Sequence, residues 1–208
     1  NLPSNPQLLD WLALRFESDG WSIKKMIRLI VTSETWQRSS RPMNGAVDLD
    51  PENRFFARSN VRRLEAEAIR DSLLSVSGRL DDQLYGDSVG ISSPRRSVYV
   101  KVIRNALDPF LRAFDFPEPF STVGRRNVTN VPAQSLAIMN DAQISGLAID
   151  WARRILIDEK LAGDPQRVNQ MFLDAFGREA SEVEIAKSLD YLKQTRQIVS
   201  QRTLARKT

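Results

Sequence analysis

The sequence predicts a mostly α-helical fold: a compact multi-helix domain of about seven to nine helices, with at most a small β element near residues 97–102. Apolar residues recur at three- and four-residue intervals along most of the chain, which places them on one face of a helix. Cap-forming residues or proline precede many of these stretches, and several end at glycine, as helices do. Only residues 98–102 concentrate the β-branched and aromatic side chains that are typical of a strand.

Two helices are predicted before residue 32. Ser4 or Asn5 is the expected cap of the first helix, with Pro6 in its first turn, and Gly20 ends it. Ser22 caps the second helix, whose apolar stripe consists of Ile23, Met26, Ile27 and Ile30. Trp21 stands where a hydrophobic staple onto that helix would be, so we interpret it as a core residue.

The middle of the chain alternates loops with helical sequence. Residues 37–50 predict a long loop, after which Asp50 and Pro51 restart a helix. A long amphipathic helix is predicted within residues 62–80, with Gly78 as its stop. Residues 81–97 are rich in Asp, Gly, Ser and Pro and predict an exposed connector, and Val98 to Val102 favour a short strand.

The second half of the chain is predicted to be helical, apart from an extended crossing at Pro117 and Pro119. Ser181 and Glu184 have the spacing of a capping box at the start of the last helix, which we expect to run through Leu192. The helices expected in this half cover residues 107–114, 132–139, 144–157, 165–176 and 182–192.

Cysteine and histidine are both absent from the chain. The lack of cysteine excludes disulfides, thiolate zinc sites and covalent haem attachment. Without histidine there is no serine triad, and catalysis would need carboxylates, a Lys or Tyr base, or an all-oxygen calcium or magnesium site. We therefore expect no metal site and no cofactor in this segment. Whether it is an enzyme stays open, with a non-enzyme favoured.

The length of 208 residues fits one domain, and we expect residues 1–208 to be a single domain. The chain begins with Asn1 and shows no signal-peptide pattern, so we interpret it as a fragment of a larger multidomain protein. No apolar run approaches the roughly 18 to 20 residues that span a bilayer, and no membrane span is expected.

Positive charge is concentrated in residues 95–126, which carry 7 Lys/Arg and 3 Asp/Glu. The predicted anion-binding residues are Arg95, Arg96, Arg104, Arg125 and Arg126. Guanidinium groups bind carboxylate or phosphate through two parallel hydrogen bonds, so an acidic or sulfated glycan, a phosphate group or a haem propionate would suit them. The alternative is structural: the same arginines pair with Asp115, Glu118 and main-chain carbonyls and hold loops in place.

Other functional readings are weaker. Asp115 and Glu118 form a candidate acid pair for glycoside hydrolysis, although their spacing does not show that the two carboxyl groups converge. A polar loop is the preferred reading of the acidic residues Asp81, Asp82 and Asp87, because they lack the spacing of a calcium loop. Nucleic acid is not an expected partner, because the net charge of +4 is small and no recognised motif is present.

Six stretches of the sequence carry a family resemblance: NPQLLDWLA from residue 5, RLIVTSETWQRSS from 28, RRLEAEAIRDSLLSVSGRL from 62, RRSVYVKVIRN from 95, FDFPEP from 114 and GRRNVTNVPAQSLAIMND from 124. Together they resemble the domain of unknown function 1553, also called planctomycete-specific domain 1. The chain departs from the family at Asn5, where relatives often have histidine, and after Leu192, where the family's usual closing helix is missing.

The resemblance implies a context and no catalytic residues. Relatives often carry an upstream cytochrome c-like haem domain, and c-type haem is attached outside the cytoplasm, so the resemblance implies export to the periplasm or cell surface. We interpret the chain as a non-catalytic accessory or interaction module of a larger exported protein, with neighbouring domains of the same parent chain, and an anionic ligand or glycan, as expected partners. The alternatives are a carboxylate-based hydrolase of extracellular polysaccharide and a docking partner of the cytochrome c-like domain.

Overall fold

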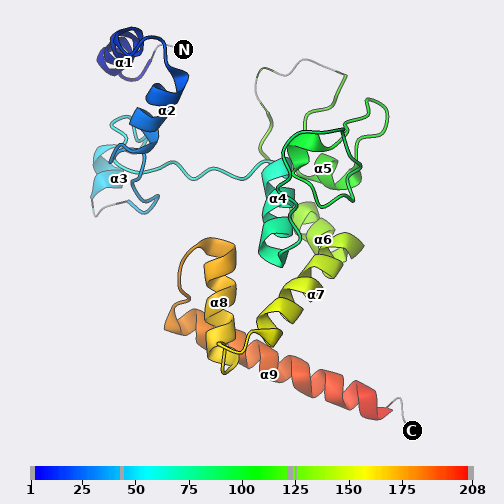
Figure 1. Ribbon diagram of the computed structural model, residues 1–208. Coiled ribbons are helices and arrows are strands. Elements are labelled where there is room, and N and C mark those ends of the chain that lie inside the picture. The colour runs from blue at the N-terminus through cyan, green and yellow to red at the C-terminus, as the bar shows by residue number, and fades with distance from the viewer. Residues whose placement is uncertain (1–2, 43–44, 121–123, 125, 206–208) are drawn as a thin grey trace. The chain divides into compact units, whose positions relative to one another are not determined.

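The structure is a computed structural model that describes residues 3–42, 45–120, 124 and 126–205 (Figure 1). Within these ranges the chain forms nine α-helices and one 3-10 helix, and two isolated β-bridges are its β structure. The prediction of a mostly α fold is therefore confirmed. The chain divides into two compact units, Asn1–Arg63 and Leu64–Thr208. A compact unit is not by itself a domain, so the single domain of 1–208 stays a prediction.

The first unit contains α1 (Pro6–Ser18), α2 (Ile23–Val31) and the short α3 (Ala46–Leu49). Both predicted caps are present: Asn5 Oδ1 accepts from Leu8 N at 3.0 Å, and Ser22 Oγ accepts from Lys25 N at 3.4 Å. Trp21 was wrongly predicted as a core residue. It has a positive φ of 58°, meets Phe16 edge-on at a centroid distance of 5.3 Å and is 68% exposed.

Asp50 and Pro51 do not start a helix, contrary to the prediction. The Asp50 carboxylate accepts from Arg54 N and Phe55 N at 2.8 and 2.9 Å, and the donation from Phe55 is the main cause that lowers its pKa. Asn53 has a φ of 55° and bonds Arg58 through both ends of its amide. Short polar side chains that bond nearby main-chain groups compete with a helix, and here they close a turn.

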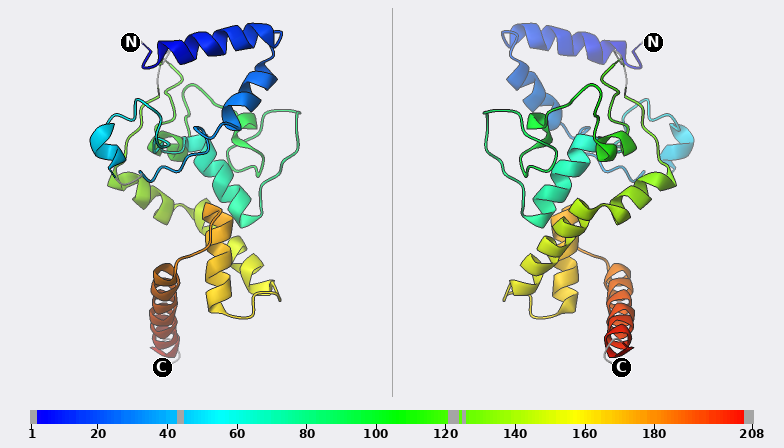
Figure 2. Two further views of the ribbon diagram at one scale, coloured as in Figure 1. Left: turned by 90° about the vertical axis from the view of Figure 1, so that its left-hand side faces the viewer. Right: turned by 90° about the vertical axis from the view of Figure 1, so that its right-hand side faces the viewer.

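The second unit is built around α4 (Ala66–Ser77). It packs against α5 (Pro109–Ala113), α7 (Ala142–Ile157), α8 (Asp164–Phe176) and the 3-10 helix η1 (Ser97–Tyr99) (Figures 1 and 2). Helix α6 (Pro132–Asn140) packs against α5 and α7, and α9 (Glu182–Ala205) packs along α8. The buried apolar cluster at the start of α4 consists of Ala66, Leu107, Leu111 and Phe114.

No strand forms at residues 98–102 in the part of the chain that the structure describes. The segment contains η1 and one parallel bridge, between Val89 and Val100. The reason is the buried Ser97, whose N–H and hydroxyl both donate to the Asp71 carboxylate on α4, at 2.8 and 2.6 Å. These bonds to a helix take the place of a neighbouring strand, so the β-branched side chains have no ladder to join.

Helix α8 ends, and helix α9 begins, where the sequence predicts. Gly177, with a φ of 65°, ends α8, and Ser181 with Glu184 makes the capping box of α9. Helix α9 continues to Ala205, beyond the predicted end at Leu192. Among the described residues, every helix is either too short or too polar to cross a membrane.

Candidate functional site

A buried arginine on α4 holds the connector that follows this helix. The guanidinium of Arg70 donates to the carbonyl oxygens of Ile91 at 2.7 Å and Arg95 at 2.9 Å, to that of Ser93, and to Ser97 Oγ at 3.1 Å. Burial lowers the pKa of Arg70, and the nearby carboxylates of Asp71 and Asp108 act in the opposite direction. The arginine thereby ties residues 91–97 to the helix.

Arg95 also donates to main-chain carbonyls, those of the loop that precedes it in the sequence. Its side chain is buried, and its guanidinium donates to the carbonyl oxygens of Asp87 and Gln83, each at 3.1 Å, and to that of Tyr85. The same group lies 4.0 Å from the centre of the Tyr99 ring. Arg95 therefore holds a loop, and its hydrogen bonds are to main-chain carbonyls, as in the structural alternative considered from the sequence.

Arg126 and Arg96, two other predicted anion-binding residues, contact different carboxylates. Arg126 forms a two-pronged ion pair with Glu67, at 2.8 and 2.9 Å, and also contacts Glu65 at 3.1 Å. Arg96 lies 3.9 Å from the Asp71 carboxylate, with about half of its side chain exposed, and Arg104 is exposed. Arg125 lies outside the described residues. Anion binding by these five arginines stays a prediction.

The two acids of the candidate hydrolase pair have separate partners. The Asp115 carboxylate accepts from Thr129 N and Oγ1, at 2.7 and 2.8 Å, while Glu118 lies 3.4 Å from the Arg112 guanidinium. Asp115 has a φ of 61°, which turns the chain between α5 and the following crossing. Each acid thus has a local structural contact, and its role in hydrolysis stays a prediction.

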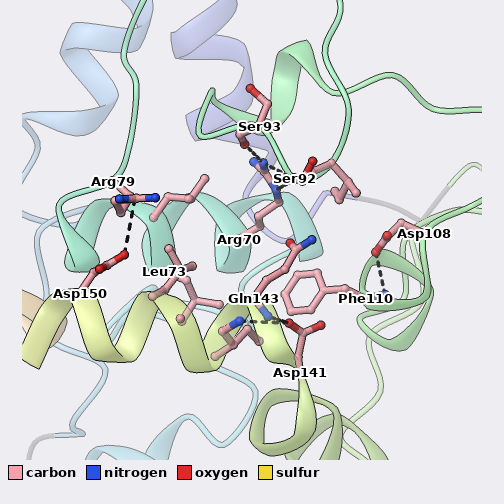
Figure 3. Close-up of a pocket in the computed structure, with 15 residues that line it drawn as sticks. Arg70, Leu73, Arg79, Ser92, Ser93, Asp108, Phe110, Asp141, Gln143 and Asp150 are labelled. Carbon is pink, nitrogen blue, oxygen red and sulfur yellow. Dashed lines mark hydrogen bonds and ion pairs between the residues drawn. The ribbon is translucent and has the colours of Figure 1, made fainter.

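A cleft of about 270 Å³ lies between α4 and α7 (Figure 3). Its apolar lining includes Leu73, Leu74, Ile91, Phe110, Ile144 and Leu147. Of its three acids, Asp108 accepts from Phe110 N at 2.8 Å and Asp141 accepts from Gln143 N at 2.8 Å, so both act as helix caps. Asp150 lies 3.6 Å from the Arg79 guanidinium. The acids of this cleft are therefore used in capping and ion pairing.

Among the described residues, every carboxyl group whose pKa clearly departs from its ordinary value has a lowered pKa. Burial is the largest single influence on the pKa of Glu67 and acts to raise it, but the hydrogen bonds from Arg126, a main-chain hydrogen bond and the charge of Arg126 together lower the pKa. The pKa of Asp164 is lowered by Arg196, and that of Glu184 is lowered to about 2 by Arg178 and by the capping contacts of Ser181. A general acid near neutral pH needs the opposite shift. No group of three or more acids in the described part of the chain is placed to hold a metal ion.

One surface that keeps positive charges available is the segment after Arg95, which we call the basic segment: residues 96–104. Its backbone is fixed by Ser97 and by a hydrogen bond from Lys101 N to Val89 O at 2.8 Å. Lys101 and Arg104 are exposed and form no ion pair with other described residues. The segment also contains three exposed apolar side chains: Val98, Val102 and Ile103. This combination of unpaired cations and apolar side chains suits a negatively charged partner surface.

Sequence reasoning missed Arg70, the residue with the most contacts in this region. The signal was its spacing, since Arg70 lies four residues from both Ala66 and Leu74, which are buried on the same face of α4. Leu64, which precedes the helix, is exposed.

Comparison with known families gives one match. The family model described as "Protein of unknown function (DUF1553)", PSD1, matches residues 1–192, which covers all of the chain up to the middle of α9. No curated protein and no solved structure matches the chain.

Proposed function

The chain belongs to the DUF1553 family, and from this premise we propose that it is a non-catalytic interaction module of a larger exported protein, which contacts an anionic group through its basic segment. The anionic group belongs to a neighbouring domain of the parent chain or to an acidic glycan. Export, the neighbouring domains and a haem propionate as one such anion are carried over from the family resemblance.

The observation that carries the proposal is the contrast in how the cations are used. Arg95 and Arg126 are occupied by carbonyl and carboxylate groups of the same unit, whereas Lys101 and Arg104 extend from an anchored backbone without an ion pair to described residues. An exposed cation on a fixed backbone loses less conformational freedom on binding than one on a mobile chain. The basic segment is therefore the better candidate for a contact surface.

The carboxyl groups whose pKa clearly shifts among the described residues all have a lowered pKa, which supports a binding role over a hydrolytic one. Hydrolysis by two carboxylates requires one of them to be protonated as the general acid. Binding through cations requires only that the charges remain exposed, and it predicts an affinity that falls with added salt.

The test compares two triple variants that remove the same charge. Arg96→Ala, Lys101→Ala and Arg104→Ala change the basic segment, and Lys160→Ala, Lys187→Ala and Lys193→Ala remove three exposed cations elsewhere in the second unit. Binding of sulfate, phosphate and a sulfated oligosaccharide is measured by titration calorimetry and by the ligand-induced rise of the thermal midpoint.

We expect the basic-segment variant to bind the sulfated oligosaccharide at least about tenfold more weakly, because each lost charge-assisted contact contributes about 1 kcal/mol or more. The control variant should bind like the unchanged protein. Equal weakening in both variants would show that net charge alone is responsible, and a lack of binding to all three anions would refute an anion-contacting surface.

A further inference from the structure

A second exposed surface lies beside the basic segment and has the opposite charge. It is the acidic loop, residues 81–87, which contains Asp81, Asp82 and Asp87, and no Lys or Arg occurs from residue 80 to residue 94. At its tip Leu84 and Tyr85 are exposed, Tyr85 to 80%. Asp82 and Asp87 form no ion pair with other described residues. The loop therefore combines negative charge with two large apolar side chains.

Hydrogen bonds from Arg95 and to Tyr99 hold the acidic loop in one conformation. Arg95 donates to three of its carbonyl oxygens, those of Gln83, Tyr85 and Asp87, and Tyr85 N donates to Tyr99 Oη at 2.8 Å. Tyr85 has a φ of 64°, which is rare for a bulky residue, and these bonds keep it there. Since the backbone is already ordered, an exposed tyrosine at this tip binds a partner at a small entropic cost.

Main-chain and side-chain contacts connect the acidic loop to the basic segment. Tyr99 contacts the loop through its hydroxyl, and Val89, just after the loop, bridges to Val100 within the basic segment. These contacts thus join a loop that contains three acids to a segment that contains three cations, Arg96, Lys101 and Arg104. Among the described residues, no ion pair joins the two groups.

We propose that the partner of this surface is a second copy of the chain, bound so that the acidic loop of each copy contacts the basic segment of the other. A two-fold axis lets one surface pair with itself when it contains two complementary parts, because both contacts then form at once. Leu84 and Tyr85 of one copy would meet Val98, Val102 and Ile103 of the other, while the three acids meet the three cations. The inference rests on the proposed function, since it gives the same basic segment a further anionic partner, the acidic loop of another copy, in addition to the neighbouring domain or glycan.

The experiment measures self-association of the 208-residue chain by sedimentation equilibrium, at low and high salt. Two charge-reversed variants are made, Asp82→Lys with Asp87→Lys and Arg96→Glu with Arg104→Glu. The matched controls reverse exposed charges elsewhere in the second unit: Glu159→Lys with Glu179→Lys, and Lys160→Glu with Lys187→Glu. Circular dichroism verifies that each variant is folded, and Arg95 is left unchanged in all of them.

We expect the unchanged chain and both controls to dimerise, with a dissociation constant that rises with salt. Each charge-reversed variant alone should dissociate at least about thirtyfold more readily, because like charges then face each other. An equimolar mixture of the two variants should form a heterodimer, since both contacts between the copies then again join opposite charges. Tyr85→Ser should weaken the dimer about tenfold, as loss of a buried aromatic contact does.

A chain that stays monomeric up to about 1 mM, beyond the range of weak specific interfaces, overturns the inference. So does a dimer that the charge reversals leave intact, or a mixture of variants that fails to associate. If the chain is monomeric but the sulfated oligosaccharide still binds through the basic segment, only this inference fails. If that binding is also absent, the proposed function fails with it.

Discussion

The acidic loop and the basic segment are separated in the sequence by residues 88–95, and the two neighbouring arginines where the basic segment begins have different environments. Arg95 is buried under the acidic loop and donates to three main-chain carbonyls, while Arg96 next to it is half exposed and lies 3.9 Å from one carboxylate. Arg70 resembles Arg95, with carbonyl partners in residues 91–95. Arg104 resembles Arg96 in its exposure.

The difference shows what makes an arginine structural in this fold. An irregular connector has carbonyl groups without helix or sheet partners, and buried carbonyls need donors. One guanidinium offers five N–H donors in a fixed plane, so Arg70 and Arg95 can each donate to three carbonyl groups of the 81–97 connector. The basic segment lies at the surface, where water can serve its carbonyls, and its cations stay available for other contacts.

The largest expected effect is that of Arg70→Met on stability. This variant leaves several buried carbonyls and the Ser97 hydroxyl without their donor, and we expect the free energy of unfolding to fall by about 3 to 5 kcal/mol. Urea denaturation followed by circular dichroism measures it. Arg104→Ala is the control and should change the free energy by less than about 0.5 kcal/mol. Equal losses in the two variants would contradict the distinction between them.

Arg95→Met should lower the free energy of unfolding by less, about 1 to 2 kcal/mol. The carbonyls of the acidic loop can hydrogen-bond to water when the guanidinium is lost. The loss should be local. Hydrogen exchange is expected to speed up at residues 83–89 and to stay slow in α4 and α7. Accelerated exchange throughout the second unit would show instead that Arg95 supports the whole unit, as Arg70 does.

Low pH distinguishes the two kinds of arginine contact. Carbonyl groups do not titrate, so the contacts of Arg95 should persist, whereas the carboxylate partner of Arg126 is protonated in acid. The pKa of Glu67 is lowered from its ordinary value of 4.5, so its pair with Arg126 stabilises the protein fully above that value and is lost as the pH falls through the lower, folded-state pKa. We expect Glu67→Gln to cost about 1 kcal/mol at pH 7 and less at pH 2. Unfolding titrations at both pH values measure the difference, and an equal cost at both would refute the pairing.

Local sequence signals predicted much of the helical framework. The caps at Asn5 and Ser22, the stop at Gly177 and the capping box of Ser181 with Glu184 are all present, because each depends on atoms within four residues. The first helices of the second half begin close to their prolines for the same reason. Helix ends without such a signal were less well placed, as the extension of α9 to Ala205 shows.

The candidate site was predicted only in outline. The excess of cations in residues 95–126 pointed to the right region, yet nothing in the sequence separates Arg95 from Arg96 or marks Arg70 as buried. The sequence by itself determined the helices, the absence of histidine and cysteine chemistry and the location of the charges. The tertiary structure alone decided which arginines hold loops and which stay exposed, because that depends on carbonyls up to 25 residues away that fold against α4.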